Sequence, residues 1–557
     1  MIEDRLLALV RAAVEDAAPG LGIEGELPEP ELLVPKQREH GDFSTNIALA
    51  LASRAGVSAR DVAQAILASF PEDPSLERVE VAGPGFLNLF VTDDWLYDVL
   101  RDIVSRGDAY GRQAPNGRRV QVEFVSANPT GPLHVGQARN AALGDALARV
   151  LAFAGWTVGR EYYYNDAGGQ MDRFGASVEA RYLQACGREA EVPEDGYRGD
   201  YVSTIAKELK ASAGETYLAM PPDERLTAIR DAAVARILAW IGRTLDRFGV
   251  SFDVYRSERD LADAGEIDDA VRRLRDAGQI YEAEGAVWFR STAFGDDKDR
   301  VVIRSNGTHT YFGADCAYLV DKFARGFDHL IYVWGADHHG DVARVRGAAQ
   351  ALGYDAEAVE VVLYQWVSFL RDGRPLPMSK RAGTFVTLDE LMDEVGTDAA
   401  RFTLLQYSND SAMNFDIDLV KRQTMENPVY YVQYGHARIA SILRKAVAEG
   451  VALKPVADAD LTLLTHETEL DLLRALAEIP GKLALAAEQR APHRLTHASQ
   501  DLAARFHRFY TECRVVSDDE ALTQARLWLS AATKQVIANL LGLLGVSAPE
   551  SMERSDG

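Results

Sequence analysis

The stretch that decides the fold is VSANPTGPLHVGQARN, residues 125–140. Before it, Val120, Val122 and Phe124 alternate with polar residues as in a β-strand, and after it apolar residues recur with a helical period from Leu143 onward. Prolines, glycines and polar residues fill the connection. This order of strand, glycine-containing loop and helix is typical of a unit that binds phosphate at the N-terminus of its helix.

The same order returns later in the chain. HLIYVW (329–334) has the pattern of a strand, GADHHG (335–340) that of a loop, 345–352 that of a helix and 359–364 that of another strand. Alternating strands and helices predict an α/β fold with a Rossmann-like, doubly wound parallel sheet, whose ligand crevice lies at the carboxyl ends of the strands. Between the two halves, at about 176–300, the sequence is acidic and predicts a helical insertion.

The pattern changes at both ends of this core. GRQAPNGRR (111–119) is rich in Gly, Pro and Arg, as linkers are, and the residues before it mix helical and strand-like patterns. After about Thr397 the strands stop and helical periodicity takes over, up to a last helix closed by Gly545. We therefore predict three domains: a small N-terminal α/β domain at 1–112, a catalytic domain at 113–397 and a C-terminal all-helical domain at 398–557.

The composition excludes several classes of protein. The 557 residues carry a net charge of −24, which confines any binding of nucleic acid to one local basic face. No stretch has the length and apolarity of a transmembrane helix, and the acidic start does not read as a secretion signal. Cys186, Cys316 and Cys513 lie far apart, so we expect neither disulfides nor a zinc cluster. A cytoplasmic protein without a membrane partner is the expectation.

His134 and Gly136 stand at the junction of loop and helix. An imidazole can donate a hydrogen bond to phosphate, and a glycine allows a nucleotide to approach the backbone. The alternative is a tight strand-to-helix turn with a packed histidine, and the short motif by itself does not decide between the two.

A second motif lies more than two hundred residues later, in RPLPMSKRAGT (374–384). It places Lys380 and Arg381 between Gly and Pro residues, where a cationic loop can close on a triphosphate and stabilise the leaving pyrophosphate. A solvated basic loop is the alternative. The two motifs together are far more specific than either one.

The combination of HxGx and MSK on a split doubly wound fold resembles the class I aminoacyl-tRNA synthetases. More narrowly, the whole chain resembles bacterial arginyl-tRNA synthetases. The stretches that carry this resemblance are VPKQREHGDFSTNIALALA, GPGFLNLF, VEFVSANPTGPLHVG, YYYNDAGGQ, GYRGDYV, NGTHTYFGADCAYLVDKF, IYVWGADHHG, MSKRAGTFVTLDELMDEVGTDAARF and NPVYYVQYGHARI.

The resemblance implies a ligase that activates L-arginine with ATP and Mg²⁺ and passes the arginyl group to the 3′-terminal adenosine of arginine tRNA. It implies no zinc and no organic prosthetic group. The matching catalytic positions are His134, Gly136, Gln137 and Lys380, and those that bind ATP also include Met378 and Ser379. The family's second histidine is Gln137 here, and its usual lysine before Met378 is Pro377, so Lys380 has to supply the charge of the loop.

An enzyme for arginine has to recognise a guanidinium, which a carboxylate can meet with two hydrogen bonds. Asp315, in TYFGADCAY, is the candidate, and Tyr311 lies on the same face if the segment is helical. The alternative for Asp315 is a surface acid at the start of a helix. The resemblance adds Glu123 and Asn128, which would hold the α-amino and carboxylate ends of the arginine substrate. It also places His339 in the amino-acid pocket.

A metal site in GADHHG is a further alternative. Asp337, His338 and His339 are adjacent loop residues, which rarely converge on one ion, and the sequence offers no evident fourth ligand. We therefore expect no metal held by protein ligands.

The resemblance also assigns roles to the flanking domains. It implies that the helical domain reads the anticodon and that the N-terminal domain contacts the tRNA elbow, with the candidate residues Asn88, Tyr434, Arg438 and Trp528. Aromatic residues at helical spacing more often belong to a core, which is the alternative for this group. The family is mostly monomeric, and its activation of the amino acid requires bound tRNA.

Two other functions fit part of the pattern. A small-molecule adenylyltransferase has a similar HxGH-like turn, but it lacks a long helical C-terminal domain and an MSK loop at this distance. The second is a catalytically inactive paralogue that binds tRNA. It stays an alternative because Gln137 replaces the family's second histidine.

Overall fold

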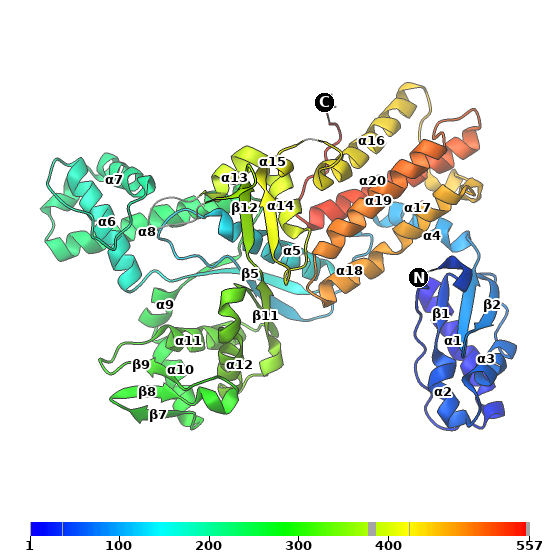
Figure 1. Cartoon of the computed structure of the whole chain (residues 1–557), viewed down its shortest axis with the longest axis horizontal. Helices are drawn as coiled ribbons and strands as arrows, with labels where there is room; N and C mark the ends of the chain where they lie inside the picture. The colour runs from blue at the N-terminus through cyan, green and yellow to red at the C-terminus, as the bar shows by residue number, and fades with distance from the viewer. Residues whose placement is uncertain (1, 36, 377–385, 423, 553–557) are drawn as a thin grey trace. The chain divides into compact units, whose positions relative to one another are not determined.

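The computed structural model describes residues 2–35, 37–376, 386–422 and 424–552 (Figure 1). Met378, Ser379 and Lys380 lie outside these described residues. The chain divides into two compact units. The first comprises 1–106, 452–477 and 509–532, and the second comprises 107–451, 478–508 and 533–557.

The first unit contains a three-stranded antiparallel sheet of order β1-β3-β2, with helices whose apolar faces form its core. The elements of its N-terminal segment are α1 (Ile2–Ala17), β1 (Phe43–Thr45), α2 (Ile47–Ala55), α3 (Ala59–Ala68), β2 (Leu76–Ala82), β3 (Phe86–Val91) and α4 (Asp94–Arg106). Strands β2 and β3 account for the strand-like patterns expected before the linker at 111–119. Asn88 lies on the central strand β3 and is only 6 % exposed, so little of its side chain is accessible.

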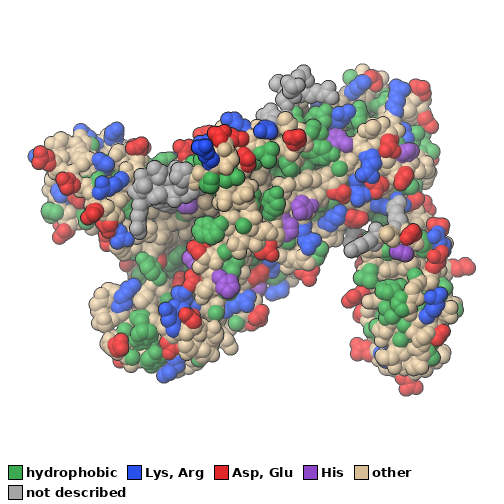
Figure 2. All heavy atoms as spheres, in the orientation of Figure 1, with side chains coloured by type: hydrophobic (Ala, Val, Ile, Leu, Met, Phe, Trp, Pro, Cys, Tyr) green, Lys and Arg blue, Asp and Glu red, His purple; other side chains and the backbone are tan. Residues whose placement is uncertain are grey.

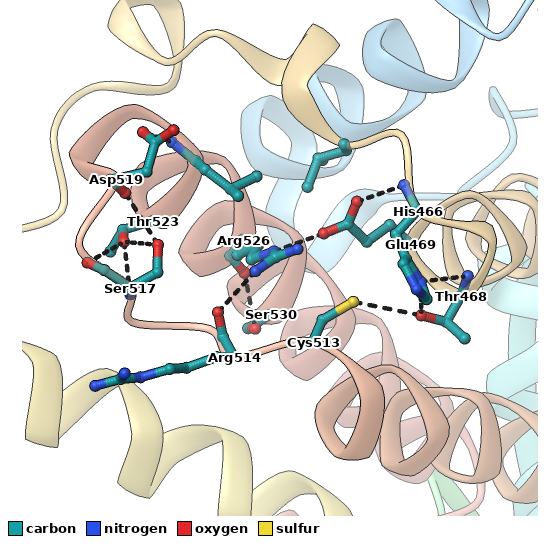
Figure 3. Close-up of polar contacts among 12 residues, drawn as sticks. His466, Thr468, Glu469, Cys513, Arg514, Ser517, Asp519, Thr523, Arg526 and Ser530 are labelled. Atoms are coloured by element: carbon teal, nitrogen blue, oxygen red, sulfur yellow. Dashed lines mark hydrogen bonds and ion pairs between the residues drawn. The ribbon is translucent and has the colours of Figure 1, made fainter.

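A polar cluster joins two helical segments of this unit (Figure 3). The Glu469 carboxylate on α17 (Glu467–Ala477) accepts hydrogen bonds from Nε of Arg526 at 2.6 Å and from the backbone N–H of His466 at 2.9 Å. Arg526 also donates to the carbonyl oxygen of Arg514 at 2.8 Å. Because the buried carboxylate and the guanidinium satisfy each other, they fix the start of the loop before α20 (Glu520–Leu543).

The main sheet of the second unit is parallel and has the order β11-β10-β4-β5-β6, which confirms the predicted doubly wound core. Its strands are β4 (Arg119–Glu123), β5 (Thr157–Tyr164), β6 (Val254–Ser257), β10 (His329–Gly335) and β11 (Val359–Tyr364). The helices that follow β4 and β10 are α5 (Ala138–Phe153) and α12 (Val342–Ala351). Helix α5 packs so closely on β4 that a Cβ on Gly144 would lie 2.2 Å from Phe124.

The predicted insertion differs in part from the structure. It contains the long helices α6 (Gly169–Ala185), α7 (Asp200–Ala213) and α8 (Pro222–Arg247), as expected. However, the range 176–300 also includes the edge strand β6 of the main sheet and most of a small antiparallel sheet, formed by β7 (Ile280–Ala283), β8 (Ala286–Phe289) and β9 (Arg300–Ile303). These strands have only four residues each, too few to show a clear alternation in the sequence.

The expectation that strands stop after Thr397 is also wrong. The segment β14 (Met413–Asp416) pairs in parallel with β12 (Val367–Arg371), which pairs with β13 (Arg374–Pro375). The remaining helices are α9 (Glu258–Asp263), α10 (Glu266–Asp276), α11 (Tyr311–Ala324), α13 (Leu388–Val395), α14 (Thr397–Leu405), α15 (Ile417–Val420), α16 (Pro428–Ala448), α18 (Ile479–Glu488) and α19 (His493–Glu512). The last helix, α20, ends before Gly545 at φ +67°, as predicted.

A buried arginine joins distant segments of the second unit. Arg401, on α14, forms an ion pair with Asp145 on α5, and both side chains are 0 % exposed. The same guanidinium donates to the carbonyl oxygens of Phe248, at 2.9 Å, and Leu544, at 3.0 Å. Its charge and its donors are therefore satisfied inside the core.

The surface has mixed charge. Figure 2 shows lysine and arginine side chains interspersed with acidic ones over the face in view. Among the described residues, no helix combines the length and apolarity that a membrane crossing requires.

Candidate functional site

The chain makes an unusual turn where strand β4 ends. Val125 and Ser126 adopt positive φ values of 65° and 44°, a conformation that costs a β-branched residue energy. Asn140 holds this turn, because its side-chain oxygen accepts from the N–H of Val125 at 2.5 Å while its amide donates to the carbonyl of Val333 on β10 at 2.9 Å. The turn is thus fixed at the point where β4 and β10 meet.

His134 folds back over the start of the following helix. Its Nδ1 accepts a hydrogen bond from the N–H of Gly136 at 3.1 Å, so a neutral ring carries its proton on Nε2 and can donate it to an anion. A Cβ on Gly136 would lie 2.8 Å from the ring, which explains why glycine occupies this position. The Gln137 side-chain oxygen accepts from the N–H of His134 at 3.2 Å, and this leaves its amide group as the donor.

The segment after the MSK motif is anchored at this turn. The N–H of Val135 donates to the carbonyl of Val386 at 3.0 Å, and the N–H of Leu388 donates to the carbonyl of Leu133 at 2.8 Å. Lys380 lies outside the described residues, but Val386 follows it by only six positions in the sequence. The first described residues after the MSK motif therefore lie against the turn that contains His134.

A cavity of about 670 Å³ opens beside this turn. Its wall combines residues from the ends of β4, β5, β6, β10 and β11, the edge at which a doubly wound sheet binds its ligand. Of the predicted site residues, it brings together Glu123, Asn128, His134, Gly136, Gln137, Tyr311 and Asp315. His339 does not line this cavity, whereas its neighbour His338 does.

One end of the cavity is acidic. Helix α11 begins at Tyr311, so Tyr311 and Asp315 lie on one helical face as predicted. Asp315 is open to the cavity but lies deep in the protein, and burial together with the nearby Glu258 and Glu123 raises its pKa to about 7. Burial likewise raises the pKa of Glu258, which accepts a hydrogen bond from the Tyr163 hydroxyl at 2.9 Å. Two carboxylates therefore face the same space.

Two further carboxylates near this end are paired with cations. Nζ of Lys322 lies 2.6 Å from Oε2 of Glu123, and Arg325 donates to Glu161 at 2.6 and 2.8 Å. Burial opposes the ionisation of Glu161, but the hydrogen bonds from Arg325 and Tyr318 and the charge of Lys322 outweigh it and hold its pKa below the usual value. Among the described residues, no ion pair links Asp315 or Glu258 to a cation, so these two carry the uncompensated negative charge.

The other end of the cavity suits a larger, flatter group. Trp334, Tyr364 and Trp366 line it together with Asp337 and His338. Trp366 is 63 % exposed, an unusual exposure for a large aromatic side chain outside an interaction site.

Sequence reasoning missed Glu258 and Lys322. Glu258 directly follows β6, so recognising that strand would have placed it at the ligand edge of the sheet. The sequence does not show this strand, because it is short and lies at the edge of the sheet. Val254 and Tyr255 are 36 % and 42 % exposed, so the strand has no alternation of buried apolar and exposed polar residues. Lys322 extends the face of Tyr311, Asp315 and Tyr318 by another turn, a spacing that the sequence does contain.

Each candidate tRNA-binding residue of the helical region makes contacts within the protein. Arg438 donates to the Tyr434 hydroxyl at 3.0 Å, and the Tyr434 ring stacks with that of His507 at a centroid distance of 6.1 Å. The Trp528 indole donates to the carbonyl of Lys454 at 2.9 Å. All three side chains are partly exposed, so each retains surface for a further contact.

No group of three or more His, Cys, Asp or Glu side chains within the described ranges could hold a metal ion. Asp337 and His338 belong to the cavity wall, and His338 lies 3.0 Å from Asp341.

Family models match almost the whole chain. Residues 4–91 match the arginyl tRNA synthetase N terminal domain, residues 99–439 match the catalytic domain of class I (R) tRNA synthetases, and residues 432–552 match the DALR anticodon binding domain.

Individual proteins are similar over the same length. The chain is 50 % identical to an arginine–tRNA ligase of Moorella thermoacetica over 98 % of both chains, and 48 % identical to one of Heliobacterium modesticaldum over 99 % of both. Among solved structures, that of Thermus thermophilus arginyl-tRNA synthetase superposes with a TM-score of 0.74 at 25 % identity, over 99 % of this chain and 100 % of the other.

Proposed function

Because the chain belongs to the arginyl-tRNA synthetases, we propose that this cavity activates L-arginine with ATP and that the arginyl group then passes to the 3′-terminal adenosine of arginine tRNA. The observation that carries the assignment of the site is the joining of two features in one cavity: the His134 turn at one end, and the uncompensated carboxylates of Asp315 and Glu258 at the other. The first suits a phosphate, and the second suits a guanidinium.

In the first step, the carboxylate of arginine attacks the α-phosphate of ATP and pyrophosphate leaves. The nucleophile is already ionised at neutral pH, so the protein needs no general base and contributes positioning and charge stabilisation. His134 donates from Nε2 to a phosphate oxygen, the Gln137 amide adds a second donor, and Lys380 neutralises charge on the leaving group. Mg²⁺ would accompany ATP and would add charge neutralisation at the phosphates.

The guanidinium lies between Asp315 and Glu258. Its planar fork of five donors can hydrogen-bond to both carboxylates, with the Tyr311 ring or hydroxyl beside it. The ammonium of lysine has three donors and a different shape, so it would leave carboxylate oxygens unpaired in the cavity. This accounts for selectivity without a separate editing step.

The transfer step requires the tRNA to reach the same cavity. The part of the chain that matches the DALR domain contains Tyr434, Arg438 and Trp528, to which we assign contacts with the anticodon arm. Phosphate contacts and stacking on aromatic rings are the usual means of holding single-stranded RNA. We further infer a monomer that works in the cytoplasm.

Activation is expected to depend on tRNA. Arginine-dependent exchange of pyrophosphate into ATP should occur with arginine tRNA present and be absent without it, because RNA docking shifts the population toward the assembled site. The measurement is the exchange rate with and without the tRNA, with a non-cognate tRNA as the control. Exchange that runs equally without tRNA contradicts the dependence, and no exchange at all from folded protein favours the inactive paralogue.

The affinity for arginine is expected to fall below about pH 7. Because the pKa of Asp315 is raised to about 7 in the free enzyme, more of it is protonated as the pH falls, and arginine has to displace that proton. The KM for arginine should therefore rise about tenfold per pH unit below pH 7 and level off above about pH 8. The KM for ATP, measured in parallel, is the control, and a KM for arginine that stays flat from pH 5.5 to 8.5 contradicts this assignment.

A further inference from the structure

A lysine lies directly behind the acidic end of the cavity. Lys322 occupies the same face of α11 as Asp315 and Tyr318, and its side chain is 0 % exposed. Its Nζ lies 2.6 Å from Glu123 and 4.1 and 3.7 Å from the ring centroids of Tyr318 and Tyr332. Glu123 and both tyrosines line the cavity, whereas Lys322 does not. The ammonium therefore cannot touch a ligand, but it contacts three groups that can.

The position of the Lys322 ammonium determines how many of the surrounding carboxylates lack a cationic partner. Four carboxylates surround this end of the cavity: Arg325 compensates Glu161, Lys322 compensates Glu123, and Asp315 and Glu258 remain. One guanidinium can engage two carboxylates with two hydrogen bonds each, which uses four of its five donors and leaves a single donor for any third carboxylate.

We propose that Lys322 is a positioning residue for arginine: by pairing with Glu123 behind the cavity wall, it limits the uncompensated carboxylates to the two that meet the guanidinium. This inference rests on the proposed function. It adds a determinant of arginine affinity that does not itself contact the substrate.

The surrounding charges set the direction of the effect. The groups that face Lys322 are Glu123 on β4, Glu161 on β5, Tyr332 on β10, and Tyr318, Asp315 and Arg325 on its own helix. Those that act on Asp315 are Glu258, Glu123, Arg344 and Lys322. Burial lowers the pKa of Lys322, and the charges of Glu123 and Glu161 partly offset this effect.

Without Lys322, one more buried negative charge would stand beside Asp315 and Glu258. Like charges held close together in a buried site take up a proton, which the set of carboxylates then shares. Arginine would have to expel this additional proton in order to bind. The free-energy cost of expelling this proton is greatest at low pH and disappears at high pH, whichever carboxylate holds the proton.

The test compares Lys322→Met, Lys322→Arg and the double variant Glu123→Gln/Lys322→Met. The KM for arginine and kcat are measured in aminoacylation between pH 6 and 9, with the thermal melting of each variant. For Lys322→Met, we expect the pH below which KM rises to move up by about one unit, a KM about fivefold higher at pH 7 and about tenfold higher at pH 6, and recovery at pH 9. Lys322→Arg should keep the wild-type midpoint. The pH midpoint of the double variant should return toward it, and because Glu123 is itself a candidate arginine-binding residue, the KM of the double variant is compared with that of Glu123→Gln rather than with that of the wild type.

A pH midpoint that Lys322→Met leaves unmoved overturns the proposal, as does a double variant displaced as far as the single one. Where Lys322→Met does not fold, Glu123→Gln carries the test with the opposite sign, because it leaves an uncompensated ammonium that moves the midpoint to lower pH. An upward shift in that variant also overturns the proposal. If the wild-type protein shows no arginine-dependent activity, the failure lies in the proposed function instead.

Discussion

Replacing Asp315 by asparagine is expected to raise the KM for arginine by about two to three orders of magnitude. The substitution keeps the size of the side chain but removes one of the two uncompensated charges in the cavity, so the guanidinium loses a charged partner. Breaking one side of a buried ion pair costs about 3–5 kcal/mol; because Asp315 is open to the cavity, the lower part of this range, about 3–4 kcal/mol, applies, and it corresponds to a factor of about 10² to 10³ in binding. Steady-state aminoacylation at saturating ATP and tRNA measures it.

A matched control is Asp269→Asn. This carboxylate is 62 % exposed on α10, and within the described part of the chain its ion pair is with Arg272 three residues later, so the same loss of charge should leave the KM unchanged. The assignment of Asp315 fails if both variants bind arginine as well as the wild-type protein, or if the KM for ATP rises by the same factor as that for arginine.

Replacing His134 by alanine should lower kcat for pyrophosphate exchange by about 10² to 10³ and leave the KM for arginine within a few fold. On the proposed assignment, Nε2 of the neutral ring would donate to a phosphate oxygen of ATP, and losing one preorganised donor to a developing negative charge typically has an effect of this size. Single-turnover formation of the adenylate separates this effect from changes in product release.

The control for this experiment is His497→Ala, since His497 is an exposed histidine on α19 outside the cavity. A His134→Ala protein that raises the KM for arginine and keeps kcat would show that the ring supports binding rather than the chemical step.

The sequence predicts the parallel sheet because the strands before the two ligand loops are either alternating or continuously apolar, and each precedes a strongly periodic helix. It also predicts that Tyr311 and Asp315 lie side by side, because residues four positions apart lie on the same face of a helix. Edge strands are different. β6 has four residues and half-exposed side chains, so Glu258, which follows it, cannot be distinguished from the many acids of the insertion.

Lys322 could not be predicted for another reason. A lysine in a helix is almost always solvated, and only the fold places Glu123, from a strand 199 positions away, within 2.6 Å of it. At the His134 turn, the sequence shows the motif but not its structural reason. HVG indicates a phosphate site, but the reason for the glycine is the space taken by the folded-back ring, which the sequence does not reveal.

The buried guanidinium of Arg401 has a consequence for how the protein matures. It links helix α5, through Asp145, to the carbonyl of Leu544, which lies 399 positions after Asp145 in the sequence. A ribosome releases these parts in order, so α5 is made long before its last support exists. Until Leu544 emerges, a charged pair that is destined for the core lacks one of its acceptors. A translation product cut short before Leu544 would thus carry every residue proposed for the site and still lack a fully supported core beneath it.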